Sequence, residues 1–244
     1  MSLAGRRALV TGGAVRLGRA LALGCAEAGM DVAIHYHASA DPAEEAVALC
    51  RARGVRSVAI QGDLRRADAC RAVVAEAERA LGGVDVLVNS AAGFLARDVA
   101  DVTEADFEAA VALNLKAPFF CAQAAAPGLA ARGWGRIVNV GDVAGLEPWP
   151  SFAVHGATKA GLLMLTRSLA QALAPEILVN AIAPGTVLMP DGSSSEAVAR
   201  SAAKTVLGRI GEPADVVGAL LYLLQADYVT GHTLVVDGGR LVRP

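Results

Sequence analysis

The sequence has few aromatic residues, few cysteines and almost no net charge. Aromatic side chains make up 4% of the 244 residues, and 22 basic residues nearly balance 24 acidic ones, leaving a formal net charge of -2. This balance provides no long-range field for nucleic-acid phosphates, so we expect no nucleic-acid partner. The four cysteines form no C-x-x-C pair, which predicts reduced core residues, with no disulfide framework and no metal site. They are Cys25, Cys50, Cys70 and Cys121.

Long hydrophobic runs are also missing, although hydrophobic residues make up 54% of the chain. Gly or charged residues interrupt every apolar stretch before it reaches bilayer-spanning length, so we expect no transmembrane helix and no membrane partner. Arg6 and Arg7 precede a short apolar run that enters a Gly-rich turn, a pattern without the apolar middle of a signal peptide. We therefore expect a cytoplasmic protein. The apolar fraction is enough for a large core, which predicts a single domain over residues 1–244.

Short β-branched runs alternate with longer Ala-rich stretches from the first ten residues to the end of the chain. This alternation predicts an α/β fold, a Rossmann-type doubly wound parallel sheet of about seven strands with helices on both faces. Strands are expected at Ala8–Thr11, Val32–Tyr36, Ser57–Gln61, Val84–Asn89, Arg136–Val140, Leu178–Ala183 and Leu234–Val236. Helices are expected at Leu17–Ala28, Pro42–Arg53, Ala67–Leu81, Glu104–Arg132, Phe152–Leu173 and Pro213–Gln225.

One irregular segment, roughly residues 185–211, interrupts this alternation. It contains Met189-Pro190-Asp191-Gly192 and three successive serines, and it follows a predicted strand. Ligands of open α/β sheets bind outside the carboxyl ends of the strands, so a substrate lid would belong here.

A Gly-rich turn joins the first predicted strand to the first predicted helix and reads Thr11-Gly12-Gly13-Ala14-Val15-Arg16-Leu17-Gly18. Gly12 and Gly18 permit a tight turn, and the free N–H groups and dipole of a helix N-terminus favour a pyrophosphate. Arg16 adds a positive charge. An ordinary strand-to-helix turn would have similar glycines, so this loop alone does not establish a nucleotide site.

The second predicted strand ends in His35-Tyr36-His37-Ala38-Ser39, without a carboxylate. Folds that prefer NAD usually place an acidic residue here to hold the ribose 2′-hydroxyl. Arg16, His37 and Ser39 would instead donate hydrogen bonds to a 2′-phosphate, which favours NADPH (NADP+) as the cofactor. The alternative is that these histidines are surface residues at a strand end.

Several motifs together resemble the short-chain dehydrogenase/reductase family, from about Arg7 to the C-terminus. They are Thr11-Gly12 with Gly18, Gly62-Asp63-Leu64, Leu87-Val88-Asn89-Ser90-Ala91, Asn114, His155-Gly156-Ala157-Thr158-Lys159-Ala160-Gly161, Asn180-Ala181-Ile182-Ala183-Pro184-Gly185 and Val236-Asp237-Gly238-Gly239. The resemblance implies that Asp63 binds the adenine amino group and that Lys159 holds the nicotinamide ribose. Other residues implied in the cofactor site are Thr11, Leu17, His35, Tyr36, Leu64, Asn89, Ser90, Ala91, Pro184 and Gly185.

The family resemblance also implies a homotetramer, in which the helices containing Glu104–Arg132 and Phe152–Leu173 pack against their symmetry mates. Ala-rich faces would allow such close approach of helices, but they would equally suit packing within one chain.

Within this family the chain is most similar to the pteridine reductase branch. Arg16-Leu17-Gly18 and His35-Tyr36-His37, followed by Ser39, carry the similarity. The branch implies that Phe94 stacks on a pterin ring, and it has Asp142 where most of the family has a catalytic Ser. Leu188, in the predicted lid, is a further candidate substrate contact. Ala38 and Ala92 depart from the branch pattern, which has Arg and Ser at these positions.

The largest departure from the family is at the catalytic acid, where Tyr-x-x-x-Lys reads His155-x-x-x-Lys159. Residues four apart share a helix face, and Asp142 precedes His155 by 13 positions, so we expect Asp142, His155 and Lys159 to converge. The resemblance implies that Asn114 holds a water against the Lys. A charged Lys159 would disfavour an imidazolium at position 155, whereas an ionised Asp142 would favour it and orient the ring.

These features support three functional hypotheses. The first is an NADPH-dependent reductase that transfers a hydride to a pterin-like C=N bond or a related carbonyl, with a small molecule as its substrate. The second is a reductase of a 3-oxoacyl thioester or another ketone, because the fold hosts many specificities. The third, from another class, is a dinucleotide-binding protein with little turnover and a regulatory or partner-binding role, because the proton donor has changed.

Overall fold

The computed structural model describes residues 2–190 and 192–243. Seven parallel strands form one sheet in the order β3-β2-β1-β4-β5-β6-β7, so the chain begins in the middle of the sheet and changes direction after β3. The predicted single-domain, doubly wound sheet is confirmed, and its switch point lies between β1 and β4. The strands are β1 (Arg7–Thr11), β2 (Asp31–Tyr36), β3 (Ser57–Gln61), β4 (Val86–Asn89), β5 (Gly135–Val140), β6 (Ile177–Pro184) and β7 (Thr233–Val236).

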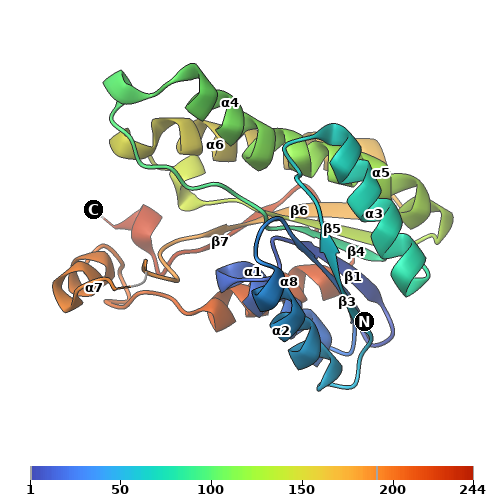
Figure 1. Ribbon diagram of the computed structural model, residues 1–244. Helices are drawn as coiled ribbons and strands as arrows, with labels where there is room; N and C mark the ends of the chain where they lie inside the picture. Colours follow the sequence, from blue (N-terminus) through green and yellow to red (C-terminus); the bar gives the residue numbers. More distant parts are fainter. Residues whose placement is uncertain (1, 191, 244) are drawn as a thin grey trace.

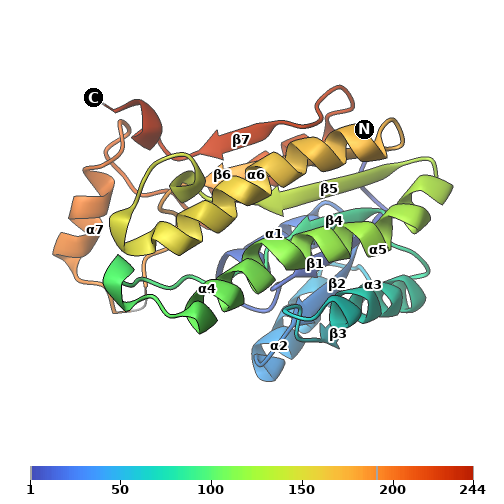
Figure 2. The same cartoon turned by 90° about the horizontal axis from the view of Figure 1, so that it is seen from above.

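Helices cover both faces of the sheet (Figure 1). One face carries α1 (Arg16–Glu27), α2 (Ala40–Arg51) and α8 (Pro213–Gln225), and the other carries α3 (Ala67–Leu81), α4 (Glu104–Val111), α5 (Ala117–Ala131) and α6 (Ala153–Leu173). Viewed from above, α5 and α6 run along the central strands (Figure 2). Each face has its own apolar core, one containing Leu21, Ile34 and Leu220 and the other Leu87 and Leu129. The four cysteines are buried, as predicted.

The helix predicted over Glu104–Arg132 is interrupted, which corrects that prediction. A π-helical turn at Ala112–Lys116 separates α4 from α5, and the N–H of Ala117 donates to the carbonyl of Ala112. Pro118 has no backbone N–H, so it cannot serve as the α-helical donor to the carbonyl of Asn114. The turn therefore forms where an α-helical ladder could not continue.

By length and composition alone, Glu104–Ala131 is apolar enough to cross a membrane. However, the π-helical turn interrupts it, α5 packs on α3, and α4 packs on α6. We therefore assign this stretch to the layer of helices over the sheet.

The segment predicted as irregular, residues 185–211, contains a helix, α7 (Ser195–Ala202). Ser194 is its N-cap, and the Oγ of Ser194 accepts the N–H of Ala197. The serines that predicted a loop therefore include the residue that starts a helix. We call residues 185–211 the lid segment; Asp191 within it lies outside the described residues. In Figure 1 α7 lies near the C-terminus, toward the carboxyl ends of the strands.

Candidate active site

The phosphate loop (residues 11–18) between β1 and α1 has no room for side chains at two of its glycines. A Cβ on Gly18 would overlap the carbonyl oxygen of Gly12, and a Cβ on Gly12, whose φ is +64°, would lie 2.9 Å from the Cα of Ala91. The N-cap residue of α1, Val15, makes no side-chain cap at the start of this helix. This cradle fits a pyrophosphate, because helix N-termini favour anions.

Thr11 fixes the phosphate loop to the end of β4. Its Oγ1 accepts the N–H groups of Ser90 at 2.9 Å and Ala91 at 3.1 Å. Asn89 is buried, and its Nδ2 donates to Oδ1 of Asn139 at 2.9 Å. This amide bridges β4 and β5, but Oδ1 of Asn89 has no hydrogen-bond partner among the described residues, so the place of Asn89 in the cofactor groove stays a prediction.

The imidazole of His35 is occupied within the protein, which corrects its predicted contact with the cofactor. Its Nδ1 accepts the N–H of Gly12 at 3.1 Å, and its Nε2 donates to the carbonyl of Gly62 at 3.1 Å. These partners require the neutral tautomer with its proton on Nε2. The ring is 3% exposed, and burial lowers the pKa of His35 to about 4.

The side chains of the other predicted adenosine-side residues differ in exposure. His37 is exposed, and Ser39 is the N-cap of α2 but makes no side-chain cap bond, so its hydroxyl has no role in the helix. Tyr36 and Leu17 pack against the core, and Leu64 is buried. Tyr36 and Leu17 are only partly buried, so their contacts with a cofactor stay a prediction.

Two charged residues of the predicted cofactor site have partners on the protein. Nη2 of Arg16 donates to the carbonyl of Met189 at 3.2 Å and so connects the phosphate loop to the lid segment. Both carboxylate oxygens of Asp63 accept hydrogen bonds from Arg65, which lowers the pKa of Asp63 to about 2. Asp63 is therefore ionised at neutral pH and keeps acceptor capacity for an amino group.

The candidate catalytic residues gather where β5 ends and α6 begins. Nε2 of His155 lies 3.3 Å from Oδ2 of Asp142, and Nδ2 of Asn114 lies 3.5 Å from Nδ1 of His155. Nζ of Lys159, one turn further along α6, donates to the carbonyl of Val140 at 2.7 Å. The His155 side chain is 4% exposed and that of Asp142 is 23% exposed. The carboxylate is therefore the more accessible member of the Asp142–His155 pair.

The two ring nitrogens of His155 both face acceptors. Nδ1 lies 3.2 Å from the carbonyl oxygen of Gly93, and Nε2 faces the carboxylate of Asp142. The amide of Asn114 already donates to Gly93 at 3.0 Å and to Oγ1 of Thr158 at 3.2 Å, so it has no further proton for the ring. Both acceptors have a donor if Nδ1 of His155 carries one proton and a second proton lies between Nε2 of His155 and Oδ2 of Asp142. The geometry therefore fits a pair that shares one transferable proton.

Lys159 is buried close to this pair. Burial lowers the pKa of Lys159 to about 8, and the negative charge of Asp142 opposes that shift. Lys159 is therefore still largely charged at neutral pH.

Aromatic rings border the pair on one side. Phe94 stacks on Phe152 with ring centroids 4.4 Å apart, and it meets the His155 ring edge-on at 4.8 Å. Phe94 is 59% exposed, so it offers apolar ring surface beside His155. Sequence reasoning missed Phe152, although its position three residues before His155 was a signal that both belong to one helical turn.

The C-terminal segment supports these rings. Trp149 packs edge-on against Phe152 at 5.8 Å, and the guanidinium of Arg240 lies 4.6 Å from the centre of the Trp149 ring. Arg240 also pairs with Glu147 at 2.9 Å. No signal in the sequence brought Arg240 to this loop, because the contact joins segments far apart in the chain.

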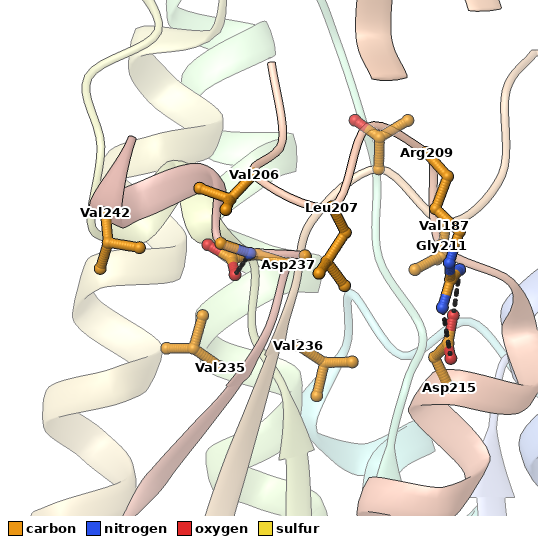
Figure 3. A pocket seen from close by; sticks show the side chains of 13 residues that line it. Val187, Val206, Leu207, Arg209, Gly211, Asp215, Val235, Val236, Asp237 and Val242 are labelled. Carbon is orange, nitrogen blue, oxygen red and sulfur yellow. Dashed lines mark hydrogen bonds and ion pairs between the residues drawn. The ribbon is translucent and has the colours of Figure 1, made fainter. Parts of the chain in front are cut away.

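A cavity of about 440 Å³ lies between the lid segment and the end of β7 (Figure 3). Val206 and Leu207 line it from the lid segment and Val235 from β7, with the ion pair between Arg209 and Asp215 at one edge. Leu188, a predicted substrate contact, is 37% exposed and is not among the residues that line this cavity. Within residues 2–190 and 192–243, no group of three His, Cys, Asp or Glu residues is arranged to hold a metal ion.

Comparison with known proteins identifies the family. Residues 13–240 match a family model described as enoyl-(acyl carrier protein) reductase. The 3-oxoacyl-[acyl-carrier-protein] reductase FabG of Staphylococcus aureus is 37% identical over 241 residues, covering 96% of this chain and 97% of the relative. The chain belongs to the short-chain dehydrogenase/reductase family. It is therefore an oxidoreductase by family.

Two solved structures of this family are similar over nearly the whole chain. A short chain dehydrogenase from Burkholderia cenocepacia in complex with NADP is 35% identical, with a TM-score of 0.92 and coverage of 99% of this chain and 100% of that one. FolM alternative dihydrofolate reductase 1 from Brucella canis, complexed with NADP, is 32% identical, with a TM-score of 0.93 and coverage of 100% and 96%.

The buried His35 predicts an acid-sensitive fold. Because the pKa of His35 is about 4 in the folded chain and near 6.5 when unfolded, the unfolded chain binds more protons between these values. The free energy of unfolding should therefore decrease by up to about 3 kcal/mol as the pH falls from 6.5 to 4. Urea unfolding of the wild type and of His35→Gln across this range measures the contribution. Parallel pH dependences in the two proteins would contradict it.

Proposed function

We propose that this protein is an NADPH-dependent reductase that adds a hydride and a proton across a C=N bond of a pterin-like ring. The observation that carries the proposal is the position of the exposed Phe94 ring beside the Asp142–His155 pair. An aromatic face suits a planar ring, and a carboxylate can accept hydrogen bonds from ring N–H groups. The similarity to a protein named as an alternative dihydrofolate reductase supports this choice.

The cofactor site of the proposal uses the switch point of the sheet. Bound NADPH would supply the hydride. Gly12, Gly18 and the start of α1 would hold its pyrophosphate, and Lys159 would hold the nicotinamide ribose. Further donors and groove residues would be Arg16, His37 and Ser39 at the 2′-phosphate, Asp63 at the adenine, and Ala91, Pro184 and Gly185 near the nicotinamide. The relatives in complex with NADP support this assignment.

The Asp142–His155 pair would supply the proton in place of the usual Tyr. His155 is nearly closed to solvent, so the proton would leave from Oδ2 of Asp142 while Nε2 of His155 gives up its share. The substrate nitrogen gains this proton. The pair is then left with an ionised Asp142 and a neutral ring that keeps its Nδ1 proton on the carbonyl of Gly93, and solvent restores the missing proton.

A second candidate function is reduction of a 3-oxoacyl thioester. The similarity to FabG and the apolar cavity beside the lid segment favour it, because Val206, Leu207 and Val235 would accommodate an acyl chain. The same pair would then protonate a ketone oxygen.

One assay distinguishes pterin-like substrates from 3-oxoacyl thioesters. We expect purified protein to oxidise NADPH with dihydrobiopterin or dihydrofolate at a higher kcat/KM than with an acetoacetyl thioester, and to use NADH less well. Absorbance at 340 nm gives the rates. A preference for the thioester would replace the first function by the second, and tight NADPH binding without turnover would favour a binding protein.

The proton pair is tested by Asp142→Asn, which keeps the size of the side chain but removes the shared proton. We expect kcat to fall by about 100-fold or more, with the Kd for NADPH changed by less than about threefold. Stopped-flow rates and NADPH fluorescence measure the two quantities. Asp98→Asn, at an exposed carboxylate, is the matched control. Unchanged turnover in Asp142→Asn would reject the proton pair.

We also propose a homotetramer, because apolar side chains remain exposed on the layer of helices that contains α4, α5 and α6. Phe107, Phe119 and Met164 are 51%, 36% and 58% exposed, respectively. Size-exclusion chromatography with light scattering should give four times the mass of one chain at micromolar concentration. A monomer would refute this assembly, and Phe107→Glu with Met164→Glu should reduce the mass if the assembly uses this layer.

A further inference from the structure

We infer that His35 is a positioning residue for the adenosine half of the dinucleotide, acting by joining the phosphate loop to the loop after β3 (residues 62–66). The inference rests on the proposed NADPH site. It concerns a residue that would not touch the cofactor itself, because both ring nitrogens are used within the protein.

The imidazole lies between two loops that leave neighbouring strands. It accepts the N–H of Gly12 from the loop after β1, and it donates to the carbonyl of Gly62 from the loop after β3. The backbone strengthens both connections: the N–H of Gly13 donates to the carbonyl of His35 at 3.0 Å, and the N–H of Gly62 donates to the carbonyl of Tyr36 at 3.0 Å. The end of β2 thus sets the separation of the two loops.

Both loops pack closely against their neighbours at a glycine. A Cβ on Gly62 would lie 2.6 Å from Cγ2 of Val73, and a Cβ on Gly13 would lie 3.0 Å from the carbonyl oxygen of Val10. If the ring is replaced by an apolar side chain, the N–H of Gly12 and the carbonyl of Gly62 lose their partners at a half-buried position. The loops would then move apart or admit water.

Loss of the His35 ring should weaken binding of the adenosine half of the cofactor only. The two tied loops carry Arg16 and Asp63, which are predicted to contact the phosphates and the adenine. The nicotinamide half would be held by Lys159 on α6 and by Gly185 after β6, and β1, β4 and β5 lie between β2 and β6 in the sheet. A residue with only a general packing role would weaken both halves together or neither.

The test uses fragments of the cofactor as probes. We expect His35→Leu to raise the Kd for NADPH and for adenosine 2′,5′-bisphosphate by about tenfold or more, measured by calorimetry. The Kd for reduced nicotinamide mononucleotide should change by less than about twofold. His35→Asn, whose amide oxygen can still accept the N–H of Gly12, should be intermediate, and His232→Leu removes an exposed imidazole as the matched control.

An unchanged Kd for the bisphosphate in His35→Leu, or equal weakening of both fragments, would overturn the inference. If His35→Leu does not fold, the same comparison is made with His35→Asn and His35→Gln, each of which can restore one of the two hydrogen bonds. Wild-type protein that binds neither NADPH nor the bisphosphate would instead reject the proposed cofactor site, and the inference with it. Binding of these probes needs no turnover, so an error in the proposed substrate leaves the test intact.

Discussion

The contact between Nε2 of His155 and Oδ2 of Asp142 is the interaction on which the proposed chemistry depends. Two acceptor groups face the imidazole, the carboxylate on one side and the carbonyl of Gly93 on the other, and both require protons on the ring or on the acid. The surrounding backbone keeps the pair close. A Cβ on Gly156 would lie 2.8 Å from the carbonyl oxygen of Ala144, so the loop that carries Asp142 packs directly on α6.

The replacement of Tyr by His changes where the proton resides. A phenol could present its own hydroxyl to the substrate, whereas the ring of His155 is buried and both its nitrogens are engaged. The accessible oxygen of Asp142 would then become the point of delivery, with His155 behind it as the partner that holds the shared proton. Lys159 is buried close to the pair, and the negative charge of Asp142 opposes the lowering of the pKa of Lys159 that burial causes.

Buried polar side chains at the strand ends give the rest of the site its shape. Thr11 connects β1 to the loop after β4, His35 connects the loops after β1 and β3, and Asn89 connects β4 to β5. The hydrogen bonds of Thr11 and His35 are complete within the protein, whereas Oδ1 of Asn89 has no hydrogen-bond partner among the described residues. Asp142 and Lys159 lie at the end of β5, and Phe94 lies in the segment that follows β4.

The sheet and most of the site could be predicted from the sequence, because β-branched runs and Ala-rich stretches alternate and the spacing between Asp142 and His155 brings both to one place. Three features could not. The π-helical turn at Asn114 depends on Pro118, which removes a donor from the backbone hydrogen bonds of the helix. Helix α7 begins in serines that also suit a loop. The orientation of His35 depends on two loops that are distant in sequence. Spacing places residues near one another, but it does not give the direction of a ring nitrogen or the sharing of a proton.

The most direct measurement is the NMR spectrum of protein with ¹⁵N-labelled histidine at neutral pH, with the His155 signals assigned by their loss in His155→Phe. A shared proton predicts a strongly downfield exchangeable proton coupled to Nε2 of His155, which disappears in Asp142→Ala, together with a protonated Nδ1. A ¹⁵N chemical shift of Nε2 typical of an unprotonated ring nitrogen, without the downfield proton, would contradict the claim that the Asp142–His155 pair replaces the missing Tyr as the proton donor.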